Sequence, residues 1–119
     1  MARADGVRRV FCGNDVFVRG IVEFSNCCAN DCLYCGLRRD NEKLPRYRMT
    51  ADEIVDAVDQ VSDLGIETVV LQSGDDLAYS AEALAAIVRR IKARHPGMAI
   101  TLSVGERPLL EYEVLRNAG

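Results

Sequence analysis

Hydrophobic residues follow two patterns along the chain, one typical of strands and one typical of helices. Three segments are rich in β-branched and aromatic residues and predict strands. They cover residues 16–25, 66–73 and 98–104. After each of them, apolar residues spaced by three or four positions predict a helix. These helices begin near Thr50, Ser80 and Pro108.

The ends of the predicted helices carry local signals. Thr50 followed by Glu53 has the pattern of a capping box. Gly65 is typical of a helix end, and Pro96 with Gly97 interrupts the second helix. The residues expected on the buried helix faces are Ile54, Ala57, Val58, Val61, Leu64, Leu84, Ile87, Val88, Ile91, Leu110 and Leu115.

The alternation of strands and helices predicts an α/β fold with a parallel sheet. Strands of such a sheet are usually apolar on both faces. One alternate set of strand positions is polar here and consists of Arg19, Glu23, Ser25, Thr68, Gln72, Thr101 and Ser103. A polar inner face favours a β/α barrel whose interior holds a polar ligand.

The length of the chain limits how much of a barrel it can form. A closed barrel of eight strand–helix units needs about 250 residues, whereas this chain has 119. We expect about three units, the N-terminal half of a partial barrel and a piece of a larger protein, which alone turns over little or no substrate. Residues 1–15 are expected to be a shortened lead-in segment and residues 16–119 the barrel half.

Composition narrows the classes of function. Hydrophobic residues make up 49% and charged residues 28%, which is typical of a folded domain. A net charge of −3 offers no basic surface for nucleic acid. No apolar run reaches the roughly 18 residues of a membrane helix, and the N-terminus lacks the apolar core of a signal peptide. We expect a cytoplasmic protein without nucleic-acid or membrane partners.

The segment CANDCLYCG carries the most distinctive chemistry. Cys28, Cys32 and Cys35 are spaced C-x3-C-x2-C, and Tyr34 precedes the last thiol. Cys27 brings the count to four cysteines in nine positions. In a reducing compartment such a cluster is more typical of metal ligands than of disulfides.

Four interpretations of the cluster are open from the residues alone. A structural zinc site needs four ligands, usually in two short-spaced pairs, and only one such pair is present. A fully ligated iron–sulfur carrier needs a fourth cysteine, which Cys12 could supply only if the first strand folded back. Buried, unreactive thiols suit Cys12 and Cys27. The last interpretation is a 4Fe–4S cluster held by three thiolates, with one iron open to a small ligand.

Two further loops are expected beside the cysteine loop. In β/α barrels the functional loops follow the carboxyl ends of the strands. Ser73-Gly74-Asp75 follows the second predicted strand, and Gly105-Glu106 follows the third. The sequence therefore predicts that all three loops lie on one rim.

The C-x3-C-x2-C spacing, with an aromatic residue before the last cysteine, resembles the signature of the radical S-adenosylmethionine (radical SAM) superfamily. The resemblance implies a partial TIM barrel in which Cys28, Cys32 and Cys35 bind a 4Fe–4S cluster. It also implies that the amino and carboxylate groups of S-adenosylmethionine occupy the open iron. In this superfamily the reduced cluster cleaves S-adenosylmethionine to methionine and a 5′-deoxyadenosyl radical.

The same resemblance implies roles for residues on the predicted rim. The segment around Tyr34 would lie against adenine. Ser73, Gly74 and Asp75 occupy the place of the motif that receives the methionine amino group. Glu106 would contact the ribose or the methionyl part.

Four longer segments resemble the HydE-type maturases of iron-iron (FeFe) hydrogenase, over about residues 7–119. They read IVEFSNCCANDCLYCGLRRDN, RYRMTADEIV, VVLQSGDD and ITLSVGE. The resemblance implies S-adenosylmethionine and a small-molecule or organometallic substrate, an electron donor such as flavodoxin or ferredoxin, and other hydrogenase maturases as partners. Biotin synthase and methylornithine synthase share the outline and remain alternatives, as does a non-catalytic iron–sulfur electron carrier.

The chain departs from the HydE-type pattern at two positions, and several other residues carry weaker expectations. The HydE-type family usually has glutamate at the position of Asp75, and Cys27 stands where a different residue is expected. Of the loop arginines, at least two are expected to be simply solvated. Those arginines are Arg38, Arg39, Arg46 and Arg48. His95 is expected to act at a helix end, and Tyr47, Tyr79 and Tyr112 have no predicted role.

Overall fold

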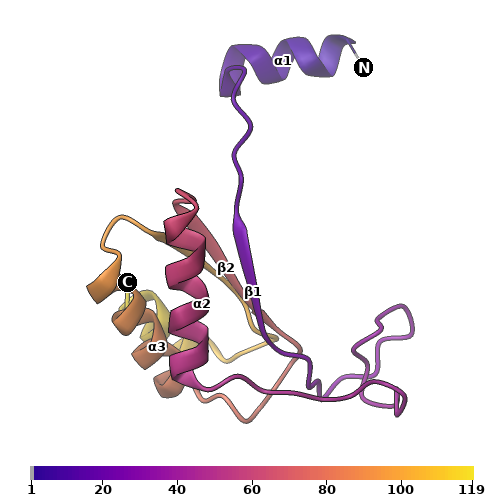
Figure 1. Cartoon of the computed structure of the whole chain (residues 1–119). Helices are drawn as coiled ribbons and strands as arrows, with labels where there is room; N and C mark the ends of the chain where they lie inside the picture. The colour runs from indigo at the N-terminus through magenta and orange to yellow at the C-terminus, as the bar shows by residue number, and fades with distance from the viewer. Residues whose placement is uncertain (1) are drawn as a thin grey trace.

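Three parallel strands form the sheet, in the order β1 (Gly20–Ser25), β2 (Thr68–Ser73) and β3 (Ala99–Ser103). The computed structural model describes residues 2–119. Helices α2 (Ala51–Asp63) and α3 (Ala81–Arg94) lie on one face of the sheet, and α4 (Leu109–Arg116) packs beside α3 (Figure 1). This arrangement confirms the predicted α/β fold built from three strand–helix units.

The helix ends follow the local signals in the sequence. The Thr50 side chain accepts a hydrogen bond from the Glu53 N–H, and Glu53 accepts one from the Thr50 N–H, which confirms the capping box. Ser80 caps α3 through the N–H of Ala83. Gly65 has a φ of 73°, the left-handed conformation in which glycine ends a helix without strain.

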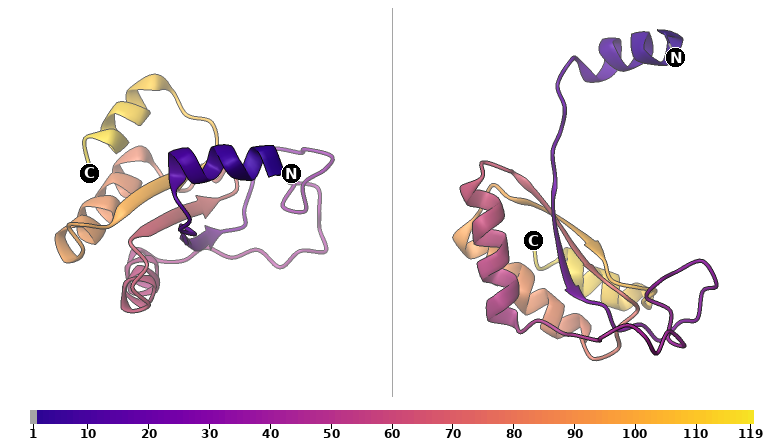
Figure 2. Two further views of the ribbon diagram at one scale, coloured as in Figure 1. Left: turned by 90° about the horizontal axis from the view of Figure 1, so that it is seen from above. Right: turned by 45° about the vertical axis from the view of Figure 1, so that its right-hand side comes forward.

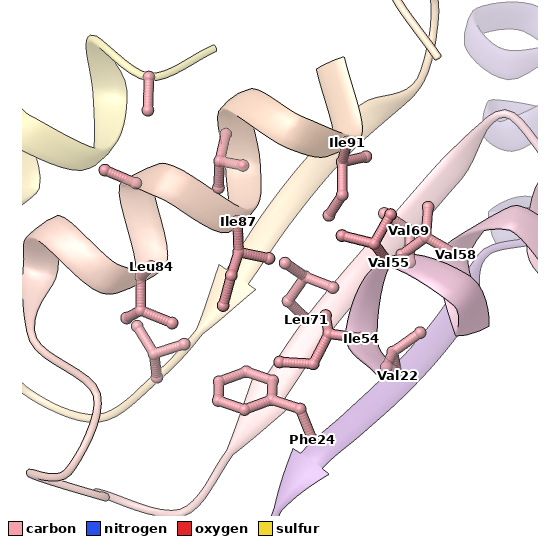
Figure 3. Close-up of a cluster of buried hydrophobic side chains, with 14 of the residues drawn as sticks. Val22, Phe24, Ile54, Val55, Val58, Val69, Leu71, Leu84, Ile87 and Ile91 are labelled. Carbon is pink, nitrogen blue, oxygen red and sulfur yellow. The ribbon is translucent and has the colours of Figure 1, made fainter. Parts of the chain in front are cut away.

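The core lies between the sheet and the two helices that cover it (Figure 3). Its labelled side chains are Val22, Phe24, Val69 and Leu71 from the strands, Ile54, Val55 and Val58 from α2, and Leu84, Ile87 and Ile91 from α3. Fully burying one such side chain stabilises the fold by about 1.5–3 kcal/mol. The core therefore holds the sheet against α2 and α3, and so fixes where the strands end.

The opposite face of the sheet carries polar side chains in register. Glu23 pairs with Gln72, and Gln72 pairs with Ser103, which forms one polar row across all three strands. The predicted polar face is thus present in this row. Ser25 is a correction, because it is only 1% exposed and does not lie on that face. A register irregularity between Glu23 and Ser25 turns its hydroxyl toward the buried Asp76.

Two other expectations of burial are wrong. Leu64 is 77% exposed because α2 ends one residue earlier and Leu64 is its C-cap. Leu110 is 73% exposed in the first turn of the short helix α4. Leu115, in the last turn of α4, is buried as expected.

The structure differs most from the sequence prediction before Gly20, because the first strand is predicted to begin at residue 16. Residues 2–12 form a helix, α1 (Ala2–Cys12), which contains no buried residue and lies away from the sheet in Figure 1 and in the right-hand view of Figure 2. Pairing of β1 with β2 starts only at Gly20. The apolar residues 16–18 are exposed because no strand among the described residues pairs with them.

No helix within residues 2–119 has the length and apolar character that crossing a bilayer requires.

An ion-pair cluster links α2 to the end of α3. Asp59 accepts a hydrogen bond of 2.5 Å from Arg94, and its other oxygen lies 2.6 Å from Nε2 of His95, the C-cap of α3. His95 is therefore a helix-end residue, as expected. The hydrogen bond with His95 and the charge of Arg94 lower the pKa of the Asp59 carboxyl despite partial desolvation.

This lowered pKa gives a test of the fold by pH. A carboxyl with a depressed folded pKa stabilises the native state above its unfolded pKa of about 4, and the effect is lost as pH falls through the folded pKa. We expect wild type to exceed Asp59→Asn in free energy of unfolding at pH 7, with the gap closing below about pH 4. Urea unfolding of both chains across this range measures it. A gap of constant size would contradict the ionic origin.

Candidate functional site

The loops that follow β1 and β2 meet in very close contact at Gly74. A Cβ atom at this position would lie 2.2 Å from the carbonyl oxygen of Cys27 and 2.8 Å from Cβ of Cys28. The contact continues in two hydrogen bonds: the Ala29 N–H donates to the Asp75 carbonyl at 2.8 Å, and the Asp75 N–H donates to Sγ of Cys28 at 3.4 Å. Only glycine leaves room for the cysteine loop here.

The loop after β3 reaches the same place. Gly105 has a φ of 80°, and a Cβ there would lie 2.3 Å from a carboxylate oxygen of Asp75. Asp75 therefore contacts both neighbouring loops. The prediction that the three loops lie together on one rim is confirmed by these contacts.

The three motif thiols differ in exposure. Cys28 and Cys35 are half-buried and Cys32 is exposed, and a hydrogen bond of 3.0 Å from the Cys35 N–H to the Cys32 carbonyl closes a turn between the last two. Among residues 2–119, no three histidine, cysteine or acidic side chains already converge as a metal site. The donor set itself fits an iron–sulfur cluster, because soft thiolates are the ligands such clusters take. The absence of a Cβ at Gly74 lets the Cys28 side chain lie directly against the loop after β2.

Arg46 holds the two ends of the cysteine loop together. Its guanidinium donates to the carbonyl of Asn26 at 2.5 Å, to that of Leu37 at 2.8 Å and to that of Arg38 at 2.6 Å. Backbone carbonyls in an irregular loop need such donors, and the fork of an arginine supplies several at once. The sequence pattern indicated no such role for Arg46. Its only signal in the sequence is its place in the RYR segment that follows the cysteine loop.

The next two residues of RYR also connect the loop to the sheet. The Tyr47 N–H donates to the Asn26 side chain at 2.8 Å, and the Tyr47 hydroxyl donates to the Glu23 carbonyl at 2.7 Å. Arg48 pairs with the buried Asp76 through hydrogen bonds of 2.7 and 3.0 Å. Tyr47 and Arg48 are thus further loop-building residues that the sequence did not reveal.

Asp76 is ionised although it is buried. Desolvation raises its pKa, but hydrogen bonds from Arg48, Ser25 and the Ala78 N–H outweigh this effect and lower the pKa below its ordinary value. The pair Asp75-Asp76 is weak evidence for a cation site. In the structure, Asp76 instead binds the guanidinium of Arg48.

The other predicted site residues lie around this junction with different surroundings. Ser73 is half-buried and its hydroxyl donates to the Gly74 carbonyl at 2.6 Å, while the Asp75 carboxylate accepts from Asn30 at 2.9 Å. Tyr34 is 93% exposed. Glu106 is exposed and has no hydrogen bond or ion pair within the described part of the chain. The structure brings Ser73, Gly74 and Asp75 to the cysteine loop and leaves the side chains of Tyr34 and Glu106 in solvent.

A pocket of about 210 Å³ opens at the junction. Its lining includes Cys27, Cys28, Arg48, Asp75 and Asp76. Cys12 is not part of this region, because it ends α1, before β1, whereas the cysteine loop follows β1 at the opposite end (Figure 1). The geometry gives no support to Cys12 as a fourth ligand.

Comparison with known sequences gives relatives over most of the chain. It is 49% identical over 116 residues to the [FeFe] hydrogenase maturase subunit HydE of Thermotoga maritima, which covers 98% of this chain and 33% of that protein. It is 31% identical over 101 residues to 3-methylornithine synthase of Methanosarcina acetivorans, or 83% of this chain and 28% of that one. The chain thus spans about a third of the length of these relatives.

Solved structures show the same fold. The crystal structure of methylornithine synthase matches with a TM-score of 0.90 and 29% identity, over 99% of this chain and 35% of that one. The FeFe-hydrogenase maturase HydG from Carboxydothermus hydrogenoformans matches with a TM-score of 0.86 and 26% identity, over 98% and 28%. These matches support the interpretation of the three strand–helix units as the N-terminal portion of a TIM-barrel-type fold.

A family model supplies the decisive comparison. Residues 22–119 match the model described as the radical SAM superfamily, so the match begins within β1 and includes all three loops of the rim. Membership implies the use of a 4Fe–4S cluster and S-adenosylmethionine. The cysteine spacing, the parallel β/α fold and this match agree, and the chain belongs to the radical SAM superfamily.

Proposed function

We propose that this chain holds a 4Fe–4S cluster through Cys28, Cys32 and Cys35 and binds S-adenosylmethionine, as part of a HydE-type maturase in the assembly of the FeFe-hydrogenase diiron cofactor. The close approach of Gly74 to Cys27 and Cys28 carries the proposal, because it joins the cysteine loop to the expected S-adenosylmethionine motif. The 49% identity to HydE over 98% of the chain supports this assignment.

The residues of the rim would bind and orient the ligands. When bound, the cluster would supply the electron that cleaves the carbon–sulfur bond of S-adenosylmethionine. The methionine amino group would donate to acceptors of Ser73-Gly74-Asp75. Among residues 2–119 the Asp75 carbonyl accepts the Ala29 N–H alone, which leaves it a lone pair. Adenine would lie against Tyr34, and Glu106 would contact the ribose or the methionyl part.

The wider setting is part of the same proposal. Residues 16–119 would be the N-terminal half of the barrel, with residues 1–15 as its lead-in. The substrate would be a small organometallic species, the electron donor a flavodoxin or ferredoxin, and the partners other hydrogenase maturases. A cytoplasmic location suits these cysteines, because a reducing compartment keeps them as thiols.

A second candidate within the superfamily is an enzyme like methylornithine synthase. The TM-score of 0.90 to the structure of methylornithine synthase supports this candidate through the similarity of the two folds. Its sequence identity is lower, 29% in the solved structure against 49% for HydE. We therefore prefer the HydE-type maturase to the methylornithine synthase-like enzyme as the proposed function.

Electron paramagnetic resonance tests the proposal. After anaerobic reconstitution with iron and sulfide, we expect a reduced 4Fe–4S signal that shifts when S-adenosylmethionine is added, because one iron is open to it. Cys28→Ala, Cys32→Ala and Cys35→Ala should each remove the signal. Cys12→Ala is the matched control and should leave it intact, since Cys12 lies beyond the far end of β1.

The outcomes separate the open-iron site from other sites. A cluster signal that ignores S-adenosylmethionine, and that is lost in Cys12→Ala, would contradict the proposal in favour of a four-thiolate carrier. Zinc bound without any cluster would contradict it in favour of a structural metal site.

A further inference from the structure

Asp76 is the most buried charged group beside the cysteine loop. Its side chain is 2% exposed, although it lies in the loop after β2. Both carboxylate oxygens are fully used. Oδ2 accepts from Ser25 at 2.5 Å and from Arg48 at 2.7 Å, and Oδ1 accepts from Arg48 at 3.0 Å and from the Ala78 N–H at 3.1 Å.

Ser25 passes this contact on to the cysteines. Its hydroxyl has one proton and two acceptors in reach, Asp76 at 2.5 Å and the Tyr47 carbonyl at 3.3 Å. The shorter contact, to the charged carboxylate, takes the proton, so the lone pairs of the hydroxyl are free to accept. The Cys27 N–H donates to that hydroxyl at 3.1 Å. The chain of hydrogen bonds therefore runs from the carboxylate through Ser25 to the backbone of Cys27, directly before Cys28.

Arg48 joins the same carboxylate to the far end of the loop. It forms an isolated antiparallel bridge with Ser25, which places the strand end and the returning chain side by side. Arg46, two residues earlier, binds the loop carbonyls already described. One buried charge thus ties the beginning of the cysteine loop, its end and the loop after β2.

We infer that Asp76 is a positioning residue: through Ser25 and Arg48 it fixes the backbone at Cys27 and Cys28, and thereby sets how tightly the three-cysteine site retains iron. The effect on iron retention rests on the proposed function. The effect on the backbone at Cys27 and Cys28 concerns the metal-free chain and does not depend on that function.

Asp76→Asn tests the inference with almost no change in volume. Each oxygen of Asp76 accepts two hydrogen bonds, so in either orientation the new NH₂ group faces two donors. Hydrogen–deuterium exchange of the metal-free chain is the first measurement. We expect the amides of residues 26–30 to exchange about tenfold faster, because buried hydrogen bonds that lose a partner are expensive.

Iron retention is the second measurement. After reconstitution, a ferrous-iron chelator should extract iron from Asp76→Asn about tenfold faster than from wild type, in line with the effect of residues that orient metal ligands. Ser25→Ala should act in the same direction. It removes the hydroxyl that lies between Asp76 and the Cys27 N–H, together with its longer contact to the Tyr47 carbonyl at 3.3 Å. It also keeps the test available should Asp76→Asn fold poorly.

Asp59→Asn is the matched control. It makes the same chemical change and also breaks a carboxylate–arginine contact, with Arg94. Its other partner, His95, precedes β3, so this cluster lies at the amino ends of the strands, away from the cysteine loop. We expect wild-type exchange at residues 26–30 and wild-type iron extraction.

Two results would overturn the inference. One is unchanged exchange at residues 26–30 in both Asp76→Asn and Ser25→Ala. The other is faster exchange spread evenly over the whole sheet, which would make Asp76 a general stability residue. A wild-type chain that takes up no cluster would contradict the proposed function, and the exchange measurement would still decide the positional role.

Discussion

Replacing Gly74 with alanine is expected to separate the cysteine loop from β2 and to reduce reconstituted iron at least about tenfold. The new Cβ would lie 2.2 Å from the Cys27 carbonyl oxygen, and real Cβ atoms are essentially never this close to a neighbour. Because that neighbour is backbone, it cannot rotate away as a side chain could. Overpacking of this kind also costs about 1–3 kcal/mol of unfolding free energy, occasionally more.

Gly97→Ala is the control for this substitution. Gly97 lies in the turn before β3, and a Cβ added there would meet no atom within 4 Å beyond its chain neighbours. Its φ is not positive, so alanine fits the backbone. We expect wild-type iron content and stability within about 0.5 kcal/mol. Iron analysis and urea unfolding of both variants make the comparison. Wild-type iron retention in Gly74→Ala would show that the close approach of the two loops is dispensable.

The sequence predicted best what depends on neighbouring residues. Helix starts at Thr50 and Ser80 rest on a side chain that caps the first turn, and these signals are complete within four residues. The alternation of strands and helices is also visible in the local periodicity of the apolar residues. For these reasons the α/β class and the rim of three loops could be predicted.

Burial and pairing depend on partners elsewhere in the chain, and there the sequence misled. Residues 16–18 have strand-like composition, but pairing begins only at Gly20, where β2 supplies partners. Ser25 has the alternation of an inward-facing polar residue. A register irregularity and a carboxylate fifty-one positions away bury it instead.

The same limit applies to the candidate site. Cys28, Cys32 and Cys35 stand out because their spacing is local. Arg46 and Tyr47 bind the loop through backbone groups of distant residues, and no pattern in one sequence encodes such contacts. The sequence therefore offers candidate ligands through local spacing, whereas the residues that shape the loop around them become visible only in the structure.

The largest loss of stability is expected from Phe24→Ala, at about 3–5 kcal/mol of unfolding free energy. Phe24 is completely buried near the end of β1, and its ring packs edge to face on Tyr79 with centroids 4.8 Å apart. Truncation would leave a cavity against both α2 and the loop before α3. A small domain has only about 5–15 kcal/mol in total, so urea unfolding should show a midpoint shifted far to lower concentration.

Phe17→Ala is the natural control, because Phe17 lies in the same predicted strand segment but is 75% exposed. It should change stability by less than about 0.5 kcal/mol. Equal losses in the two variants would mean that residues 16–18 pair and pack as part of β1. A large loss confined to Phe24 would also bear on the site, since the Phe24 carbonyl accepts the Met49 N–H directly after RYR. The residue that closes the core at this end of the sheet would then also hold the strand end from which the cysteine loop departs.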